Sequence, residues 1–566
     1  MTQTNVPDRD TRRQQHEQER LARSNPWLIL LVLCAGFFMI LLDTTIVNIA
    51  VPSIIDGLKA SLDQILWVLN AYILVYAILL ITAGRLGDVF GQRNLFVAGM
   101  VLFTIASALC GLSRDSNQLI LWRVVQGLGG ALLTPQTLAL ITSIFPPERR
   151  GAAFGVWGAV AGVAAVAGPT LGGFIVTNWS WPWIFYVNVP IGILAAIAAM
   201  LIIPDIRPGR RHSLDLFGVL LATLALLGMV FGLIEGQRYD WGTVAYGVTI
   251  VEIIAAGVVL LAAFFLWERF QAEPLVPLSL FRNRNFSLMN WIIAAMSFGM
   301  LGLFLPLTIY LQSVRGLSAL NAGLTMVPMP LTSMVVAPIA GRLSDRLGGK
   351  YILMTGLVAF AAGMAGVTLS AGLTSTWVTF LPWLVVAGAG MGCIFAPAST
   401  VAMRNIEPRM AGAASGVFNT TRQIGGTIGS AVVGAVLQNQ LSVALREQAH
   451  SRAGELPAEL PAAVRQRIVD SFNNTHALEV GRGQSGSTAP SLPLPAGIPP
   501  PLAHQIQQQV ASYFHDVFVN AYLAAMRPSL LISVLVLLLA GVSCLGIQRR
   551  RRAAAQGAGR DHMAAA

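Results

Sequence analysis

Long apolar runs alternate with short polar segments along almost the whole chain of 566 residues. Each run has about 20 residues, the length that an α-helix needs to cross the hydrocarbon core of a bilayer. Helices satisfy their own backbone hydrogen bonds there, where water is absent. The pattern predicts fourteen spans, at 27–50, 64–83, 94–112, 117–140, 151–175, 183–203, 214–234, 244–266, 287–311, 321–340, 350–370, 376–399, 412–437 and 527–547.

Basic residues between the predicted spans indicate how the chain is oriented. If the N-terminus is cytoplasmic, every predicted cytoplasmic segment carries at least two basic residues, whereas each short outer loop carries at most one. Arginine and lysine are enriched in the cytoplasmic loops of membrane proteins. The cluster from Arg549 to Arg552 continues the pattern, so both termini are predicted to be cytoplasmic.

One outer segment, 438–526, is far longer than the others. Long segments cross the membrane largely regardless of their charge, so it agrees with the predicted orientation. It combines polar helical stretches with a middle rich in Gly, Ser and Pro, and with an amphipathic stretch around Gln505–Met526. We interpret it as a mobile external cap, with substrate gating or docking of a periplasmic or cell-surface partner as the alternative.

Two short phrases occur twice. GRLGDVFGQR begins at Gly84 and resembles GRLSDRLGGK at Gly341, while the glycine-rich stretch at 151–173 resembles 412–434. Each second copy lies eight predicted spans after the first, so both copies face the same way across the membrane. Parallel repeats of this kind are related by an axis along the membrane normal.

The repeats predict an all-α polytopic membrane protein built from two parallel six-helix bundles with two inserted helices. The expected parts are a cytoplasmic tail 1–26, an N-terminal bundle 27–203, an inserted pair with its linker 204–286, a C-terminal bundle 287–547 that includes the outer segment, and a basic tail 548–566.

The charged, glycine-rich phrase predicts a tight turn between two helices on the cytoplasmic side. Glycine lets backbones approach closely, and a carboxylate beside a helix start can cap it and pair with basic residues. We hypothesise that the two copies form a charge clasp that holds the halves together and opens during transport, while a purely structural turn is the alternative. The residues assigned to it are Gly84, Asp88, Gly91, Arg93, Gly341, Asp345 and Gly348.

The composition and motifs of the chain argue against several classes of function. Charged residues make up 11%, against roughly a quarter in soluble domains. The net charge of +11 is spread over loops and termini, so it does not indicate nucleic-acid binding. The chain has no phosphate-binding loop, no cysteine or histidine pattern for a metal, and no nucleophile–base constellation. We therefore expect a protein that is not an enzyme, uses no cofactor and draws its energy from an ion gradient.

Few charged residues fall inside the predicted spans, where an ionised side chain is costly and usually functional. Asp43 in the first span and Arg123 in the fourth are predicted about 10 Å below the outer surface, so they can pair. We hypothesise that Asp43 is the proton-coupling site and that Arg123 is the partner which protonation releases. A static buried pair is the alternative, and Gln126, Asn48 and Asn70 are candidates to extend the polar network.

Glu252 is predicted in the middle of the eighth span. We favour a locally hydrogen-bonded carboxyl there, with a secondary proton or cation site as the alternative.

The fifth predicted span is rich in small residues, which permit close packing and bending. We interpret Gly162, Gly168, Pro169, Gly172 and Gly173 as a hinge and seal between the halves. In the second copy, Asn419, Arg422 and Gln423 replace small residues at a spacing that puts them on one helix face, which is a candidate cavity lining.

Six phrases in chain order resemble one family. They are LDTTIVNIAVP from Leu42, GRLGDVFGQR, RVVQGLGGA from Arg123, GVAAVAGPTLGG from Gly162, WIFYVNVPIG from Trp183 and LDLFGVLL from Leu214. Together they are similar to motifs of the fourteen-span drug:proton antiporters of the major facilitator superfamily, EmrB/QacA type. The resemblance implies a monomeric exporter in a bacterial inner membrane that exchanges protons for lipophilic drugs by alternating access. The alternative is a dedicated exporter of one endogenous metabolite, such as an antibiotic or siderophore.

Relatives that export dicationic compounds use acids in a late helix, whereas the predicted spans from 287 to 437 contain no Asp or Glu. We therefore expect monocationic, neutral or weakly anionic lipophilic substrates. The residues expected to line the substrate cavity are Asn48, Tyr72, Gln126, Trp157, Tyr310, Asn419, Arg422 and Gln423, with Phe37, Phe298 and Phe418 as further aromatic candidates.

Overall fold

The computed structural model describes residues 25–204, 215–236, 238–245, 247–407, 410–457, 460–474 and 500–548. In this part of the chain, 14 helices are long and apolar enough to cross a membrane, which confirms the predicted number. The predicted tails and the Gly/Ser/Pro-rich middle of the outer segment lie outside the described residues.

The N-terminal half contains six membrane segments. They are α2 (Pro26–Leu58), α3 (Leu62–Phe90), α4 (Gln92–Gly111), α5 (Ser116–Ile144), α6 (Arg150–Asn178), and a sixth made of the short α7 (Trp183–Tyr186) followed by α8 (Asn188–Ile202).

An inserted pair of helices follows, α9 (Leu216–Glu235) and α10 (Ile250–Glu268). A small antiparallel hairpin of β1 (Thr243–Ala245) and β2 (Val248–Thr249) joins them. The pair is fastened to the N-terminal half, because Asn70 of α3 donates a hydrogen bond to the buried Glu235 at 3.0 Å. Arg238 then bridges Glu235 at 3.1 Å and Asp63 of α3 at 2.9 Å.

The C-terminal half begins with the short α11 (Ser279–Arg282). Its elements continue as α12 (Arg284–Ile309), the π-helix η1 (Tyr310–Val314), α13 (Ala319–Met326), α14 (Pro328–Leu347), α15 (Gly349–Ser370), α16 (Trp377–Met403), α17 (Ala411–Ser451), the 3-10 turn η3 (Ala453–Glu455), α18 (Ala462–Asn474), α20 (Pro500–Ser543) and η4 (Cys544–Gly546).

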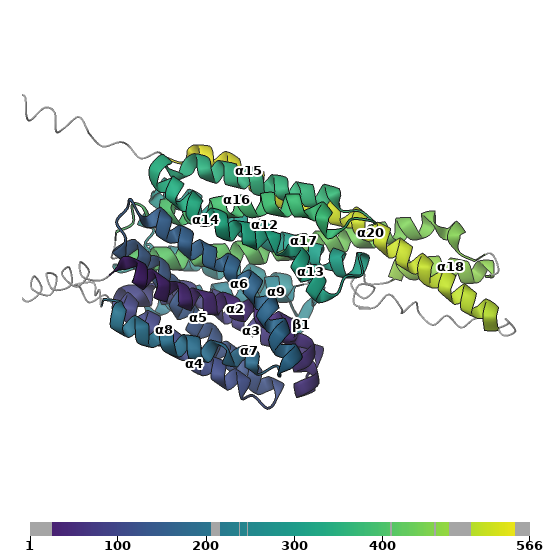
Figure 1. Ribbon diagram of the computed structural model, residues 1–566, viewed down its shortest axis with the longest axis horizontal. Coiled ribbons are helices and arrows are strands. Elements are labelled where there is room, and N and C mark those ends of the chain that lie inside the picture. The colour runs from purple at the N-terminus through teal and green to yellow at the C-terminus, as the bar shows by residue number, and fades with distance from the viewer. Residues whose placement is uncertain are drawn as a thin grey trace, which may run out of the picture.

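The two halves lie side by side with their helices roughly aligned (Figure 1). They meet along two seams, where α3 packs against α17 and α6 packs against α14. These are the second and fifth helices of each half, so the seams follow the repeat. Helix α9 contacts both α3 and α17 and so lies at one seam.

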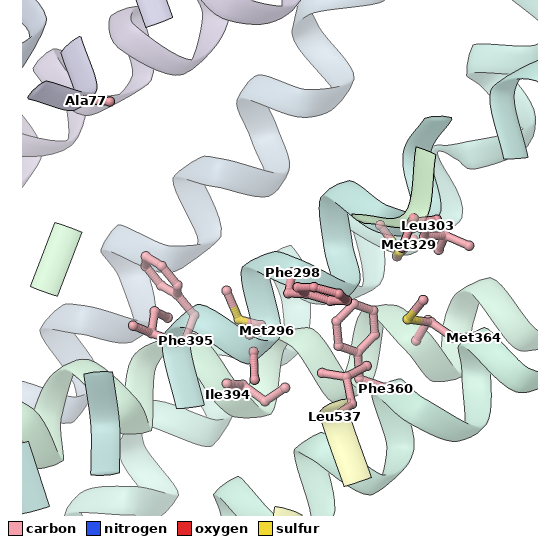
Figure 2. Close-up of a cluster of buried hydrophobic side chains, with 14 of the residues drawn as sticks. Ala77, Met296, Phe298, Leu303, Met329, Phe360, Met364, Ile394, Phe395 and Leu537 are labelled. Carbon is pink, nitrogen blue, oxygen red and sulfur yellow. The ribbon is translucent and has the colours of Figure 1, made fainter. Parts of the chain in front are cut away.

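The core of the C-terminal half shows why its helices stay together. Figure 2 shows Phe298 of α12 next to Phe360 of α15, with Leu537 of α20 beside them. These side chains are buried, as is Phe418. Phe298 and Phe418 therefore lie in the packed core, as Phe37 and Trp157 do, and their assignment as cavity aromatics stays a prediction.

Two helices are much longer than a membrane requires. Helices α17 and α20 have 41 and 44 residues, about 60 Å or more at 1.5 Å per residue, against a hydrocarbon core of about 30 Å. Their extensions pack with α18 into a projection (Figure 1). Phe472 lies against Tyr513 and Phe514, and the Tyr513 hydroxyl donates to the carbonyl of Ala449 at 2.6 Å. The described part of 438–526 is therefore packed, while its role as a mobile external cap stays a prediction.

Candidate coupling and transport site

The structure brings Asp43 of α2 and Arg123 of α5 into direct contact. Arg123 Nη1 donates to Asp43 Oδ2 at 2.5 Å, and both side chains are fully buried. Arg123 Nε also donates to the carbonyl of Val68 at 3.0 Å, and its guanidinium lies 4.3 Å from the ring centre of Tyr72. Helix α2 continues through Pro52 to Leu58, so Asp43 lies near the midpoint of its helix.

Gln126 completes the contact between the two charges. Its Nε2 donates to Asp43 Oδ1 at 2.9 Å, while its Oε1 accepts from Arg123 Nη1 at 2.8 Å. The same Nε2 is 3.3 Å from Ser107 Oγ, which also accepts from Asn188 Nδ2 at 3.3 Å. Ser107 and Asn188 were missed from the sequence, where the only signal was a polar residue in an otherwise apolar run.

This network makes the charge state of Asp43 consequential. Removing one partner of a buried ion pair typically costs about 3–5 kcal/mol, because the other charge is left uncompensated. Protonating Asp43 would remove its charge without removing the side chain, and Arg123 would lose its counter-ion. The arrangement can therefore convert the binding of one proton into a change in how α2 and α5 hold together.

A second feature joins the two halves at the end that carries the repeated phrases, called here the arginine-rich end. Asp88 near the end of α3 accepts hydrogen bonds from the backbone N–H groups of Gly412 and Ala413, both at 2.8 Å. These groups open α17 of the opposite half. A carboxylate is stabilised at a helix N-terminus by the unpaired N–H groups and the helix dipole.

The other copy does the same in the opposite direction. Asp345 near the end of α14 accepts from the N–H groups of Gly151 at 2.8 Å and Ala152 at 3.0 Å, which open α6. Each half thus supplies one acid that caps a helix of the other half. The two copies thus contact the opposite halves, as the predicted clasp requires, by joining a carboxylate to a helix start. Among the described residues, no ion pair joins Asp88 or Asp345 to an arginine of the other half.

Glycines allow the halves to come this close. A Cβ added to Gly84 would collide with the carbonyl oxygen of Gly412, and one added to Gly341 would collide with that of Gly151. Gly91 and Gly348 have φ of 92° and 84°, the left-handed region that favours glycine, at the turns that follow α3 and α14.

Arg93 Nε is buried without a hydrogen-bond partner, and the role of Arg93 in the clasp stays a prediction. Its neighbour in the repeated phrase, Arg85, lies 3.9 Å from Glu273.

The predicted hinge glycines of α6 pack against two neighbours. A Cβ on Gly162 would lie 2.5 Å from the carbonyl oxygen of Pro330 in α14, and Gly168 abuts Thr45 of α2. Gly172 abuts Ile46 of α2 in the same way, whereas Gly173 has nothing within 4 Å. Gly173 therefore takes no part in close packing, and Pro169 lies within the continuous helix between these contacts.

Part of the predicted cavity lining gathers where the halves meet. The Trp157 ring of α6 stacks on Phe37 of α2, with ring centres 4.2 Å apart, and on Phe395 of α16 at 5.1 Å. The guanidinium of Arg422 lies 5.9 Å from the Phe395 ring centre. Asn419, one turn before Arg422, is fully buried. Gln423 follows Arg422 on α17 and is partly buried.

Other predicted residues lie elsewhere. Tyr72 and Gln126 belong to the Asp43 network. Asn48 is exposed, and its amide donates to the carbonyl of Thr44 in its own helix. Tyr310 lies in η1 near the opposite end, where its hydroxyl donates to the carbonyl of Gly372 at 2.7 Å. The structure therefore does not assemble all eight residues around one cavity.

The predicted position of Glu252 is wrong. The strands β1 and β2 occupy residues 243–245 and 248–249, so α10 starts later than predicted and Glu252 occupies its first turn. The carboxylate accepts from the backbone N–H of Thr249 at 2.8 Å and from its hydroxyl at 3.0 Å, a capping box. Glu252 is exposed, and its role in this geometry is to cap α10.

The described residues hold no group of three or more His, Cys, Asp or Glu side chains placed to bind a metal ion.

Comparison with known proteins agrees with this architecture. The family model described as Major Facilitator Superfamily matches residues 33–430, and the chain belongs to this superfamily of multi-pass membrane proteins. The tetracenomycin C resistance and export protein of Streptomyces glaucescens is 36% identical over 420 residues, covering 74% of this chain and 77% of that protein. The multidrug resistance protein Stp of Mycobacterium tuberculosis is 35% identical over 448 residues, covering 79% and 82%.

A solved structure supports the fold. The proton:xylose symporter XylE superposes with a TM-score of 0.54 at 14% identity, covering 81% of this chain and 96% of that one.

Proposed function

We propose that the protein is a proton-coupled antiporter that exports lipophilic compounds, drugs among them, by alternating access. The observation that carries the proposal is the buried Asp43–Arg123 pair held by Gln126, because a membrane carboxylate with one releasable partner is suited to bind and release a proton. The names of the two relatives support the export of toxic or antibiotic compounds.

In this proposal the Asp88 and Asp345 contacts close the arginine-rich end, so that the cavity between the halves opens at the opposite end. Proton entry to Asp43 would free Arg123 and shift the preference between outward and inward states. The clasp glycines would separate as the halves rock about the α3–α17 and α6–α14 seams. A ligand or proton can drive this change only through different affinities for the two states.

The proposed orientation puts the arginine-rich end and both termini in the cytoplasm of a bacterial inner membrane. The protein would act as a monomer and use the proton gradient without a cofactor. The α17–α18–α20 projection would then lie outside the cytoplasmic membrane, where it offers a surface to periplasmic or cell-surface partners.

A narrower function, export of one endogenous antibiotic, is the second candidate. It is supported by the relative named for tetracenomycin C resistance and export. Substrate range separates the two candidates.

The test uses inside-out vesicles that contain the protein and are energised with an interior-acid pH gradient. A panel of monocationic, neutral and weakly anionic lipophilic compounds is added, and proton release is recorded against vesicles without the protein. Release with several unrelated compounds supports the multidrug exporter, and release with one compound class supports the dedicated exporter. No release with any compound contradicts both.

A further inference from the structure

Arg422 is a membrane arginine without an acid partner. It lies eleven residues into α17, and among the described residues no carboxylate forms an ion pair with it. The acids on α14 and α17, Asp345 and Glu447, lie toward the ends of these long helices. Arg422 is partly buried, and its Nε is buried without a hydrogen-bond partner. A charge in this position is costly unless an anion or water compensates it.

Two further polar groups of the predicted cavity lining are also unsatisfied. Trp157 Nε1 of α6 and Asn419 Oδ1, one turn before Arg422 on α17, are buried without a hydrogen-bond partner. More than nine in ten buried polar groups normally have one, so these exceptions need an explanation. Trp157 comes from the N-terminal half, and its ring stacks on Phe395 of the C-terminal half, the ring beside which Arg422 lies.

The repeat shows that the fold does not require this polar face. The positions of α6 equivalent to Asn419, Arg422 and Gln423 hold the small residues Gly158, Ala161 and Gly162. There, Gly158 and Gly162 pack closely against α16 and α14. An uncharged, close-packed surface is thus sufficient at this place in the architecture. The second copy instead carries a positive charge and free hydrogen-bonding groups, which indicates a ligand.

The side chains around Arg422 indicate the chemical class of that ligand. The guanidinium of Arg422 recognises a carboxylate or phenolate oxygen through charge-assisted hydrogen bonds. The indole N–H of Trp157 donates to a second oxygen. The Phe395 ring, which lies beside Arg422, supplies an aromatic contact for a flat aromatic skeleton.

We propose that Arg422 is the anion-recognition residue of the transport site and that the substrates are planar aromatic acids. This rests on the proposed export function and names its substrate class. Arg422 acts as a specificity residue, distinct from the proton-coupling pair on α2 and α5.

Equilibrium binding to the purified full chain in lipid nanodiscs tests the proposal. The probes are 2-anthracenecarboxylate and a trimethylammonium cation on the same anthracene skeleton, followed by fluorescence anisotropy. The acid is expected to bind the wild type. Arg422→Gln is expected to lower the affinity for the acid by about tenfold or more, since hydrogen bonds to charged groups are strong. Arg422→Lys should retain part of the affinity for the acid. Trp157→Phe should bind the acid more weakly than the wild type does, while its ring preserves the stack.

The controls separate recognition from folding and from coupling. Arg452→Gln, in the outer projection, should bind the acid as the wild type does, and thermal unfolding shows whether each variant is folded. If Arg422→Gln is not folded, the affinities of Arg422→Lys and Trp157→Phe for the acid test the proposal instead. Asp43→Asn should still bind the acid, because binding needs no gradient. Arg422-dependent binding without proton exchange would therefore contradict the export function and leave the recognition site standing.

Equal acid binding by the wild type and folded Arg422→Gln would overturn the proposal. Stronger binding of the cation, or no binding of the acid to the wild type, would overturn it as well.

Discussion

Asp88 of one half caps the helix of the other half that begins beside Gly412, with its Oδ1 accepting the Gly412 N–H at 2.8 Å. The same carboxylate accepts the next N–H through Oδ2, and Asp345 repeats the contact on the opposite side of the seam. Two acids therefore join the halves at the arginine-rich end through four backbone hydrogen bonds. Because hydrogen bonds to charged groups contribute roughly 1.5–3 kcal/mol each, a few of them can bias the balance between two states.

Replacing Asp88 with Asn should loosen this end. The amide can accept only through one oxygen, so one of the two N–H groups loses its partner. We expect Ser415→Cys, a buried position next to the carbonyl of Pro135, to become more reactive to a maleimide added from the arginine-rich side. Asp115→Asn, which changes a helix cap at the opposite end, is the matched control. Unchanged labelling in Asp88→Asn would show that the contact does not hold the closed state.

Replacing glycine with alanine at two positions should distinguish the effect of the close approach of the two halves from the effect of helix propensity. Gly84→Ala places a methyl group against the backbone of Gly412 and should prevent full closure, lowering both transport and thermal stability. Gly323→Ala, where nothing lies within 4 Å, should leave both properties near wild type. Comparable transport rates and unfolding temperatures in the two variants would contradict the close approach of the halves.

The α6 glycines give a sharper comparison within one helix. Gly168→Ala drives a methyl group into Thr45 of α2, whereas Gly173→Ala enters open space. The first change should impair substrate-driven proton release in vesicles, and the second should not. If Gly173→Ala impairs proton release more than Gly168→Ala does, the packing contacts do not explain which glycines matter, and the assignment of Gly173 to the hinge is supported.

The buried ion pair can be measured by a double-mutant cycle. Arg123→Gln leaves the Asp43 carboxylate without its counter-ion, so it should lower the free energy of unfolding by about 3–5 kcal/mol. Adding Asp43→Asn to Arg123→Gln removes the unpaired charge and should recover much of this loss. Additive losses in the double variant would argue against a direct interaction.

Glu252→Gln should barely affect coupling. The residue caps α10 from an exposed position, so we expect normal proton release and a stability loss of about 1 kcal/mol or less, as for other helix caps. Loss of proton release in Glu252→Gln would contradict this and would support the alternative that Glu252 is a secondary proton site.

The membrane helices were predictable because span length is set by bilayer thickness and leaves a strong apolar signal. Asp43, Arg123, Asp88 and Asp345 were found because a charge or a repeated phrase is conspicuous in an apolar chain. The lengths of α17 and α20 were underestimated, since beyond its membrane-spanning stretch a helix no longer needs an apolar sequence. Glu252 was misplaced because an apolar run does not reveal that its first residues pair as a hairpin.

Partners across the fold were harder to predict. The sequence indicated that Asp88 lies near a helix start, although which helix it caps depends on how the halves meet. Ser107 and Asn188 became part of the coupling network only when α4 and α8 were positioned in space. Tyr310 and Asn48 looked like cavity residues because a polar group in an apolar run signals a function without giving its direction.

The most direct test of the central claim compares wild type and Asp43→Asn in inside-out vesicles with an established pH gradient. Addition of a compound that the wild type exports should release protons from wild-type vesicles and none from the variant, while equilibrium binding of that compound is retained. Equal proton release by the two proteins would contradict the assignment of Asp43 as the coupling residue.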